Sequence, residues 1–254
     1  MFFRIVLFVF LMCASPARSF GAEGYADISW LNLINTMVRF NAINMSDDVM
    51  IDEYALISEC DLYKSFYANE FKWNQVRGAL RESLKMNTQT YPTKYHYDST
   101  LELERYNFRN MNFRFSEKTP LRNINSLVIY SVEGTSCPAA EVLHMPRSFR
   151  TILTVPLTLE GLPLSEDDAE ALLARMRKNN NANRVIYVRY NLRIIYVQPM
   201  KINAERKRED EPLYVQTGKV ASKDVRFDTY LDSIEFFEDP QRTKLIYTYG
   251  LNGL

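Results

Sequence analysis

Histidine is almost missing from this chain of 254 residues, which holds only His96 and His144. A Ser-His-Asp hydrolase needs a base to take the serine proton, and neither histidine stands in a recognisable motif. The sequence also lacks a Gly-x-Ser-x-Gly turn and the Cys-x-x-Cys, His-x-x-x-His and His-Glu-x-x-His spacings of zinc sites. We therefore expect no cofactor and no bound metal ion, and catalytic residues stay unknown.

Glycine is also scarce, and neither sign of charge dominates. Eight glycines leave little material for phosphate-binding loops, while aromatic residues reach 13% and favour strands. The chain has 31 basic and 31 acidic residues, and loss of the first 22 residues, with Arg4 and Arg18, would leave 29 and 31. This balance gives no electrostatic footprint for nucleic acid, so nucleic acid is not an expected partner.

The N-terminus has the layout of a secretory signal. One positive charge within Met1–Arg4 precedes Ile5–Met12, an unbroken apolar run of eight residues. A spanning helix needs about 20 apolar residues, so we expect no permanent membrane span. We predict that residues 1–22 are a cleaved signal peptide and that the protein is periplasmic or secreted. Lipidation at Cys13 is disfavoured because bulky residues precede it.

Two cysteines, Cys60 and Cys137, remain after signal removal. In an oxidising compartment they allow one disulfide, which would stabilise the fold by roughly 4 to 5 kcal/mol in the chain-entropy model. The alternative is a pair of free thiols, because Cys60 also fits an apolar helical stripe as a small hydrophobic residue.

The hydrophobic period predicts helices over residues 23–92. The first helix has core-facing residues at helical spacing and Asp27 as its N-cap. A second helix is expected from Asp47 through Cys60. The apolar faces of the first and third helices comprise Trp30, Leu33, Ile34, Met37 and Val38, and Trp73, Val76, Leu80 and Leu84.

Acidic residues gather at the start of the second helix. Asp47, Asp48, Asp52 and Glu53 could suggest calcium, but no glycine provides the turn of a calcium loop. We interpret them as acids that favour the N-terminal end of a helix dipole.

Residues 93–254 read as a β-rich segment with one helix near 165–178. Ser165 and Asp168 form the capping box of that helix, and residues 204–212 are a charged loop. The chain between the strand before this helix and the strand after it allows a parallel pair. Strands are expected over Leu101–Phe108, Met111–Phe115, Leu127–Val132, Phe149–Leu159 and Arg184–Val197, the last bulged near Asn191, with a terminal hairpin of Val225–Phe237 and Lys244–Tyr249. The expected fold is therefore α+β: an N-terminal helical segment followed by a mostly antiparallel, aromatic-rich sheet with one inserted helix.

Basic and aromatic residues interleave within one of these strand regions. The candidate binding face comprises Arg105, Tyr106, Phe108, Arg109 and Arg114. Single-strand nucleic-acid binders look locally similar, but the balanced charge argues against that use. Two interpretations stay open: a strand with one apolar and one arginine-bearing face, or a surface for an anionic envelope glycan or an envelope protein.

Several short motifs resemble those of a known family. They are Ile51-Asp52-Glu53-Tyr54, Glu59-Cys60-Asp61-Leu62-Tyr63, Phe71-Lys72-Trp73 with Val76-Arg77, and Leu162-Pro163-Leu164-Ser165 running into Ala169-Glu170. Together they resemble an uncharacterised family of exported proteobacterial proteins, a domain of unknown function, over most of the mature chain. The resemblance implies bacterial origin and export, and it implies no activity or site residues.

These observations favour an exported envelope protein that acts as a non-catalytic binding or accessory module. One alternative is a hydrolase acting on an envelope substrate, whose catalytic residues meet only in the folded chain. Another is a subunit of an envelope assembly or an inhibitor of another protein, which predicts a large exposed apolar patch. The binding hypothesis predicts a solvent-exposed cluster of aromatic residues and arginines.

Overall fold

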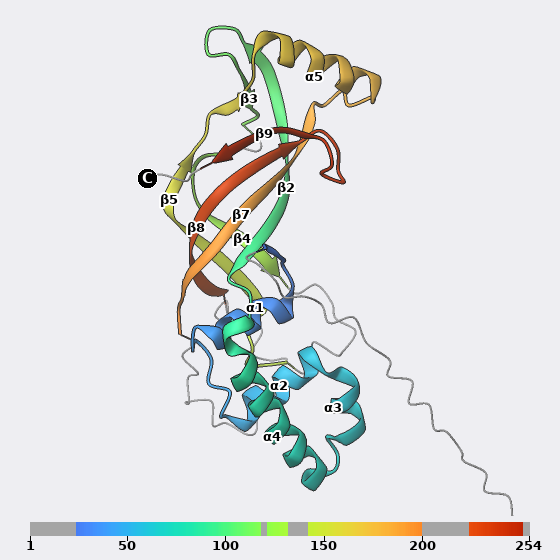
Figure 1. The fold of residues 1–254 in the computed structure, drawn as a ribbon, viewed down its shortest axis with the longest axis vertical. Helices are drawn as coiled ribbons and strands as arrows, with labels where there is room; N and C mark the ends of the chain where they lie inside the picture. The colour runs from blue at the N-terminus through green and yellow to red at the C-terminus, as the bar shows by residue number, and fades with distance from the viewer. Residues whose placement is uncertain (1–23, 118–120, 132–141, 200–223, 251–254) are drawn as a thin grey trace, which may run out of the picture.

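The computed structural model describes residues 24–117, 121–131, 142–199 and 224–250. These residues form an elongated molecule, with four helices at one end, a curved sheet along the middle and a single helix at the other end (Figure 1). The expected signal peptide over residues 1–22, Cys137 and the expected charged loop over residues 204–212 all lie outside the described residues.

The helical end forms largely where the sequence predicts it. Its helices are α1 (Trp30–Arg39), α2 (Asp48–Ser58), α3 (Cys60–Phe66) and α4 (Glu70–Asn87), preceded by the short strand β1 (Ala26–Asp27) and followed by a 3₁₀ turn, Thr88–Thr90. The second helix is not continuous through Cys60, because Glu59 leaves helical geometry and separates α2 from α3. Cys60 therefore begins α3, where it is half-buried.

The N-cap residue of α1 also differs from the one that the sequence predicted. Ser29, not Asp27, caps the helix, and its hydroxyl oxygen accepts a hydrogen bond from the Asn32 amide at 3.2 Å. A cap must directly precede the first helical residue so that its side chain reaches the second or third amide of the helix. Asp27 lies too far upstream and belongs to β1, which pairs with β2.

Within the described ranges, nine strands make up the sheet. Beyond β1 these are β2 (Lys94–Asn107), β3 (Asn112–Phe115), β4 (Arg122–Ser131), β5 (Ser148–Thr158), β6 (Gly161–Pro163), β7 (Val185–Val197), β8 (Asp224–Phe237) and β9 (Leu245–Gly250). The order is β4-β5-β8-β7-β2-β3-β6, with β1 beside β2 and β9 beside β8. The terminal hairpin of β8 and β9 and the bulge at Asn191 are confirmed.

The expectation of a mostly antiparallel sheet is wrong, because the sheet is mixed and curled. Strand β5 pairs in parallel with β8, and β1 pairs in parallel with β2. The parallel pair of β5 and β7 that the sequence allows does not form, since β8 lies between them. The curl brings Phe115 of β3 onto Phe236 of β8, with ring centroids 5.9 Å apart, although these strands are not neighbours.

The inner face of the curled sheet carries the core. Its largest fully buried side chains include Phe113, Phe149, Phe227 and Phe236. The remaining helix, α5 (Glu166–Lys178), begins as the capping box predicts, because the Ser165 hydroxyl oxygen accepts a hydrogen bond from the Asp168 amide. Its buried residues are Ala169, Leu172 and Met176.

One tyrosine of this framework predicts how stability changes at alkaline pH. Burial and a hydrogen bond from the Tyr25 hydroxyl to Asp232, at 2.9 Å, raise the pKa of Tyr25 to about 12. The folded state therefore keeps this proton at a pH where the unfolded chain has lost it. The free energy of unfolding should fall as the pH rises from about 10 to about 12. Urea unfolding at several alkaline pH values should show that the free energy of unfolding falls less steeply with pH for Tyr25→Phe than for the unaltered chain. Equal slopes for the two proteins would contradict the raised pKa of Tyr25.

Candidate functional site

The end of the molecule that carries α5 also carries the hairpin of β2 and β3 (Figure 1). Asn107 and Asn112 pair at the base of its turn. The Asn107 side-chain oxygen accepts hydrogen bonds from the amides of Arg109 at 3.0 Å and Asn110 at 3.2 Å. Met111 closes the turn with a positive φ of 47°. These contacts hold the turn in one conformation.

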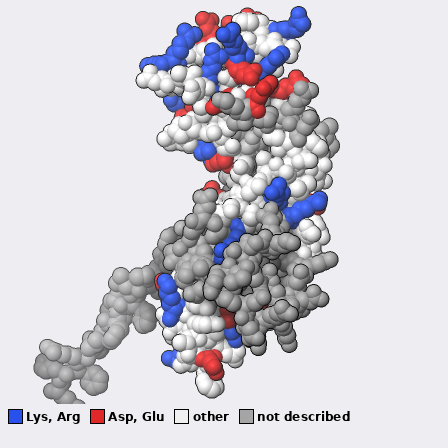
Figure 2. Space-filling model, turned by 180° about the vertical axis from the view of Figure 1, so that it is seen from behind, with Lys and Arg blue, Asp and Glu red and all other residues white. Residues whose placement is uncertain are grey.

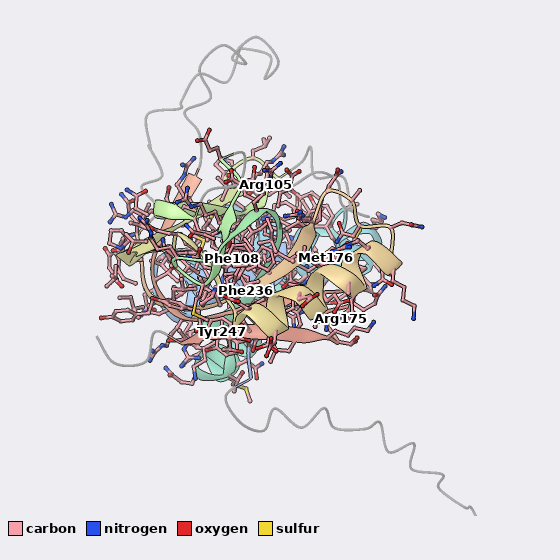
Figure 3. All side chains as sticks on the ribbon, turned by 90° about the horizontal axis from the view of Figure 1, so that it is seen from above. Arg105, Phe108, Arg175, Met176, Phe236 and Tyr247 are labelled. Atoms are coloured by element: carbon pink, nitrogen blue, oxygen red, sulfur yellow. The ribbon has the colours of Figure 1, made fainter. Side chains whose placement is uncertain are left out.

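Five exposed side chains make up what we call the tip patch: Arg105, Phe108, Arg109, Met111 and Arg114. Phe108 is 71% exposed and Met111 is 48% exposed. None of the three arginines forms an ion pair with any residue in the described part of the chain. Viewed along the long axis, Arg105 and Phe108 lie on the hairpin, and α5 with Arg175 and Met176 lies to one side (Figure 3).

A break in the strand pairing explains why Arg105 is exposed. The register of β2 against β3 shifts between Leu103 and Tyr106, so that Glu104 and Arg105 both point to solvent. Arg114 of β3 lies opposite this bulge. The stretch of β2 opposite Arg114 therefore exposes one acidic side chain, Glu104, and one basic side chain, Arg105.

Tyr106 was part of the predicted face, and the structure places it beneath the patch. Its hydroxyl donates a hydrogen bond to the Leu164 carbonyl at 2.8 Å, which ties the hairpin to the chain entering α5. Its ring meets the rings of Phe108 and Phe113 edge-on, with centroids 5.1 Å apart in both pairs. Tyr106 therefore supports the exposed Phe108 ring from below.

Charged side chains gather at this same end of the molecule. In the space-filling view both signs crowd around α5, whereas the middle of that face is mostly uncharged or not described (Figure 2). The first turn of α5 carries Glu166, Asp167 and Asp168, and its last turn carries basic residues. The pKa of Tyr106 is raised, first by burial and then by the nearby charge of Glu166. The base of the hairpin is therefore acidic on the side of α5.

His96 lies on the outer face of the sheet, away from the tip patch. Its Nδ1 is 2.7 Å from the Asn191 side-chain oxygen, and the Asn191 amide donates to the Ser233 hydroxyl at 2.8 Å. Tyr25 stacks on the imidazole with ring centroids 5.1 Å apart. Because the Asn191 amide separates imidazole from hydroxyl, this chain of contacts is not the direct Ser-His pair that a hydrolase uses.

The acidic residues near the start of α2 divide into two groups. Asp47 caps the helix by accepting from the Val49 amide at 2.8 Å, as a residue at a helix N-terminus should. Asp52 is instead buried, and its carboxylate accepts from Trp73 Nε1 at 2.8 Å and Arg77 Nε at 2.6 Å. The dipole interpretation is therefore wrong for Asp52, which joins α2 to α4.

Glu53 is buried as well, and it binds a loop distant in sequence. Its carboxylate accepts from the amides of Leu143, His144 and Met145 at 2.6 to 2.9 Å, and His144 Nδ1 lies 2.7 Å from Oε1. The dipole interpretation fails here too. His144 thus helps to hold a loop on the helical end, and its partner is a carboxylate and not a serine or cysteine.

In the described ranges, no group of three histidine, cysteine or carboxylate side chains lies close enough together to hold a metal ion.

Among carboxyl groups, Asp48 and Asp239 have lowered pKa values. For Asp48 the main cause is the hydrogen bond with Arg81, and for Asp239 hydrogen bonds with Thr243 and Lys244 outweigh the opposing effect of burial. A carboxyl group that acts as a general acid near neutral pH needs a raised pKa instead.

No helix within the described ranges is long and apolar enough to cross a membrane.

A family model described as a domain of unknown function, DUF4852, matches residues 46–175, just over half of the chain. The matched part includes Asp52, Glu53 and the tip patch, and it ends within α5. No curated protein and no solved structure matches the chain.

Proposed function

We propose that this chain, which belongs to the family of the domain of unknown function DUF4852, is an exported, non-catalytic binding module of the bacterial envelope that contacts its partner through the tip patch. The observation that carries this proposal is Phe108, an aromatic ring exposed at the end of a rigid hairpin among three arginines without ion-pair partners in the described ranges. Aromatic residues, methionine and arginine are enriched where proteins bind partners.

The shape of the molecule supports this use of the hairpin. The tip patch and the four helices lie at opposite ends of the sheet (Figure 1). A partner at the tip would therefore not need to displace Asp52 or Glu53, whose carboxylates hold the helical end together. Function at the tip and stability at the helical end are separable by substitution.

A photo-reactive phenylalanine analogue at position 108 tests this function in the native envelope. Illumination should join the chain to its partner with a high yield from position 108. Phe71 is the matched control, because its ring is 85% exposed and belongs to the helical end. Equal yields from positions 108 and 71, or no adduct from either, would rule out the tip patch as the contact surface.

Export supplies a second test, because the sequence predicts removal of residues 1–22 and a disulfide between Cys60 and Cys137. The hydrogen bonds from Leu143 and His144 to Glu53 hold the chain that follows Cys137 against α2, close in sequence to Cys60. This favours the pairing. Intact mass spectrometry of the protein from its native envelope should show loss of the signal and two thiols that react only after reduction. A full-length chain with free thiols would contradict export.

A further inference from the structure

We propose that the partner of the tip patch is an acidic protein surface with an apolar socket, into which Phe108 inserts while carboxylates of the partner pair with Arg105, Arg109 and Arg114. This inference rests on the proposed function and specifies the chemistry of the partner.

The charge of the patch indicates an acidic partner. Three exposed arginines lie within one hairpin and make no ion pair in the described part of the chain. A carboxylate is the natural complement, since the planar guanidinium group binds it through two parallel hydrogen bonds.

The apolar part of the patch indicates a protein more than a glycan. Phe108 and Met111 expose 71% and 48% of their surface beside the arginines. A charged glycan has no apolar cavity for a methionine, whereas protein interfaces place aromatic and methionine side chains at their dry centre and charged groups at the rim. Anchors of this kind carry most of the binding energy at such surfaces.

The geometry of the hairpin suits insertion. The Asn107 side chain fixes the turn through two backbone amides, and Tyr106 braces the Phe108 ring edge-on. A rigid turn loses little conformational entropy on binding. The acidic first turn of α5 lies at the base of the hairpin and would repel the carboxylates of a partner. The partner must therefore approach the arginine side, which sets its orientation.

The adduct formed by the photo-reactive analogue at position 108 identifies the class of partner. Peptide sequencing should place the linkage on a protein segment where apolar residues are flanked by aspartate or glutamate. A saccharide or lipid at the linkage, or a peptide without acidic residues, would overturn this inference while leaving the proposed function intact. Absence of any adduct would instead count against the proposed function itself.

A charge swap with the identified protein then tests the pairing. Arg109→Glu should weaken the affinity of the purified proteins by about tenfold or more, and replacing the facing acid of the partner by arginine should restore most of it. Lys85→Glu makes the same charge change on α4 at the helical end and should leave the affinity unchanged. Equal losses for Arg109→Glu and Lys85→Glu, or no recovery with the swapped partner, would refute the ionic contact.

Discussion

Replacing Glu53 with alanine should lower the free energy of unfolding by about 3 to 5 kcal/mol, the range expected when one partner of a buried charged cluster is removed. Glu53 is 4% exposed, and its carboxylate accepts hydrogen bonds from three backbone amides and contacts the His144 ring. Alanine would leave those donors unpaired in a site that water reaches poorly. The loop over residues 142–146 should then separate from α2.

Urea unfolding measures this loss, and two variants control it. Glu53→Gln keeps the volume and one acceptor oxygen, so its loss should be smaller than that of Glu53→Ala. Glu82→Ala removes an exposed acid from α4 and should change stability by less than about 0.5 kcal/mol. Equal stability of Glu53→Ala and Glu82→Ala would show that the hydrogen bonds between Glu53 of α2 and the loop contribute nothing to the stability of the fold.

Gly161→Ala should cost about 2 to 3 kcal/mol, because a side chain at this position overlaps the neighbouring strand. A Cβ atom on Gly161 would lie 2.4 Å from the Phe113 carbonyl oxygen and 3.2 Å from the Asn112 Cγ. The backbone oxygen cannot move without disturbing the pairing of β3 with β6. The hairpin that carries the tip patch would have to shift.

Gly78→Ala is the matched control for this change, since nothing lies within 4 Å of its Cβ position in the middle of α4. Alanine is favoured over glycine inside a helix by roughly 0.5 to 1 kcal/mol, so this variant should be slightly more stable than the unaltered chain. Thermal unfolding of the two variants should therefore move in opposite directions. A Gly161→Ala protein with unchanged stability would mean that β3 and β6 are not packed as closely as described.

Local signals in the sequence predicted the elements that depend on near neighbours. The capping box at Ser165 predicted the start of α5, because the hydroxyl and the amide it binds are three residues apart. The apolar spacing likewise predicted α1 and α4, with buried faces at Trp30 and Trp73. These contacts lie within one helix, so they leave a regular period in the sequence.

Contacts between distant segments left no such period. Asp52 bonds Trp73 and Arg77, and Glu53 bonds a loop about 90 residues away, so the spacing of these acids suggested only a helix terminus. The placement of β8 between β5 and β7 is equally a matter of long-range pairing. The motifs around Asp52, Trp73 and Arg77 did stand out in the sequence, but their physical role required the packing of α2 on α4.

The sequence predicted only part of the tip patch. Alternating basic and aromatic residues favoured either a two-faced strand or a binding surface, and the structure exposes Arg105, Phe108, Arg109 and Arg114. The bulge after Leu103 and the tight turn at Asn107 were not foreseen. Tyr106 faces the core side of the hairpin and Arg105 faces solvent, while Phe108, which the alternation places on the apolar face, is exposed.

Native mass spectrometry of the chain recovered from its own envelope, with Phe108→Ala compared with Phe71→Ala, tests whether the tip patch binds a partner. Each variant removes one highly exposed ring, from opposite ends of the molecule (Figure 1). A complex with a second mass should survive Phe71→Ala and be lost with Phe108→Ala, while both chains stay folded. Retention of the complex by Phe108→Ala, or its loss with Phe71→Ala alone, would contradict a binding function for the tip patch.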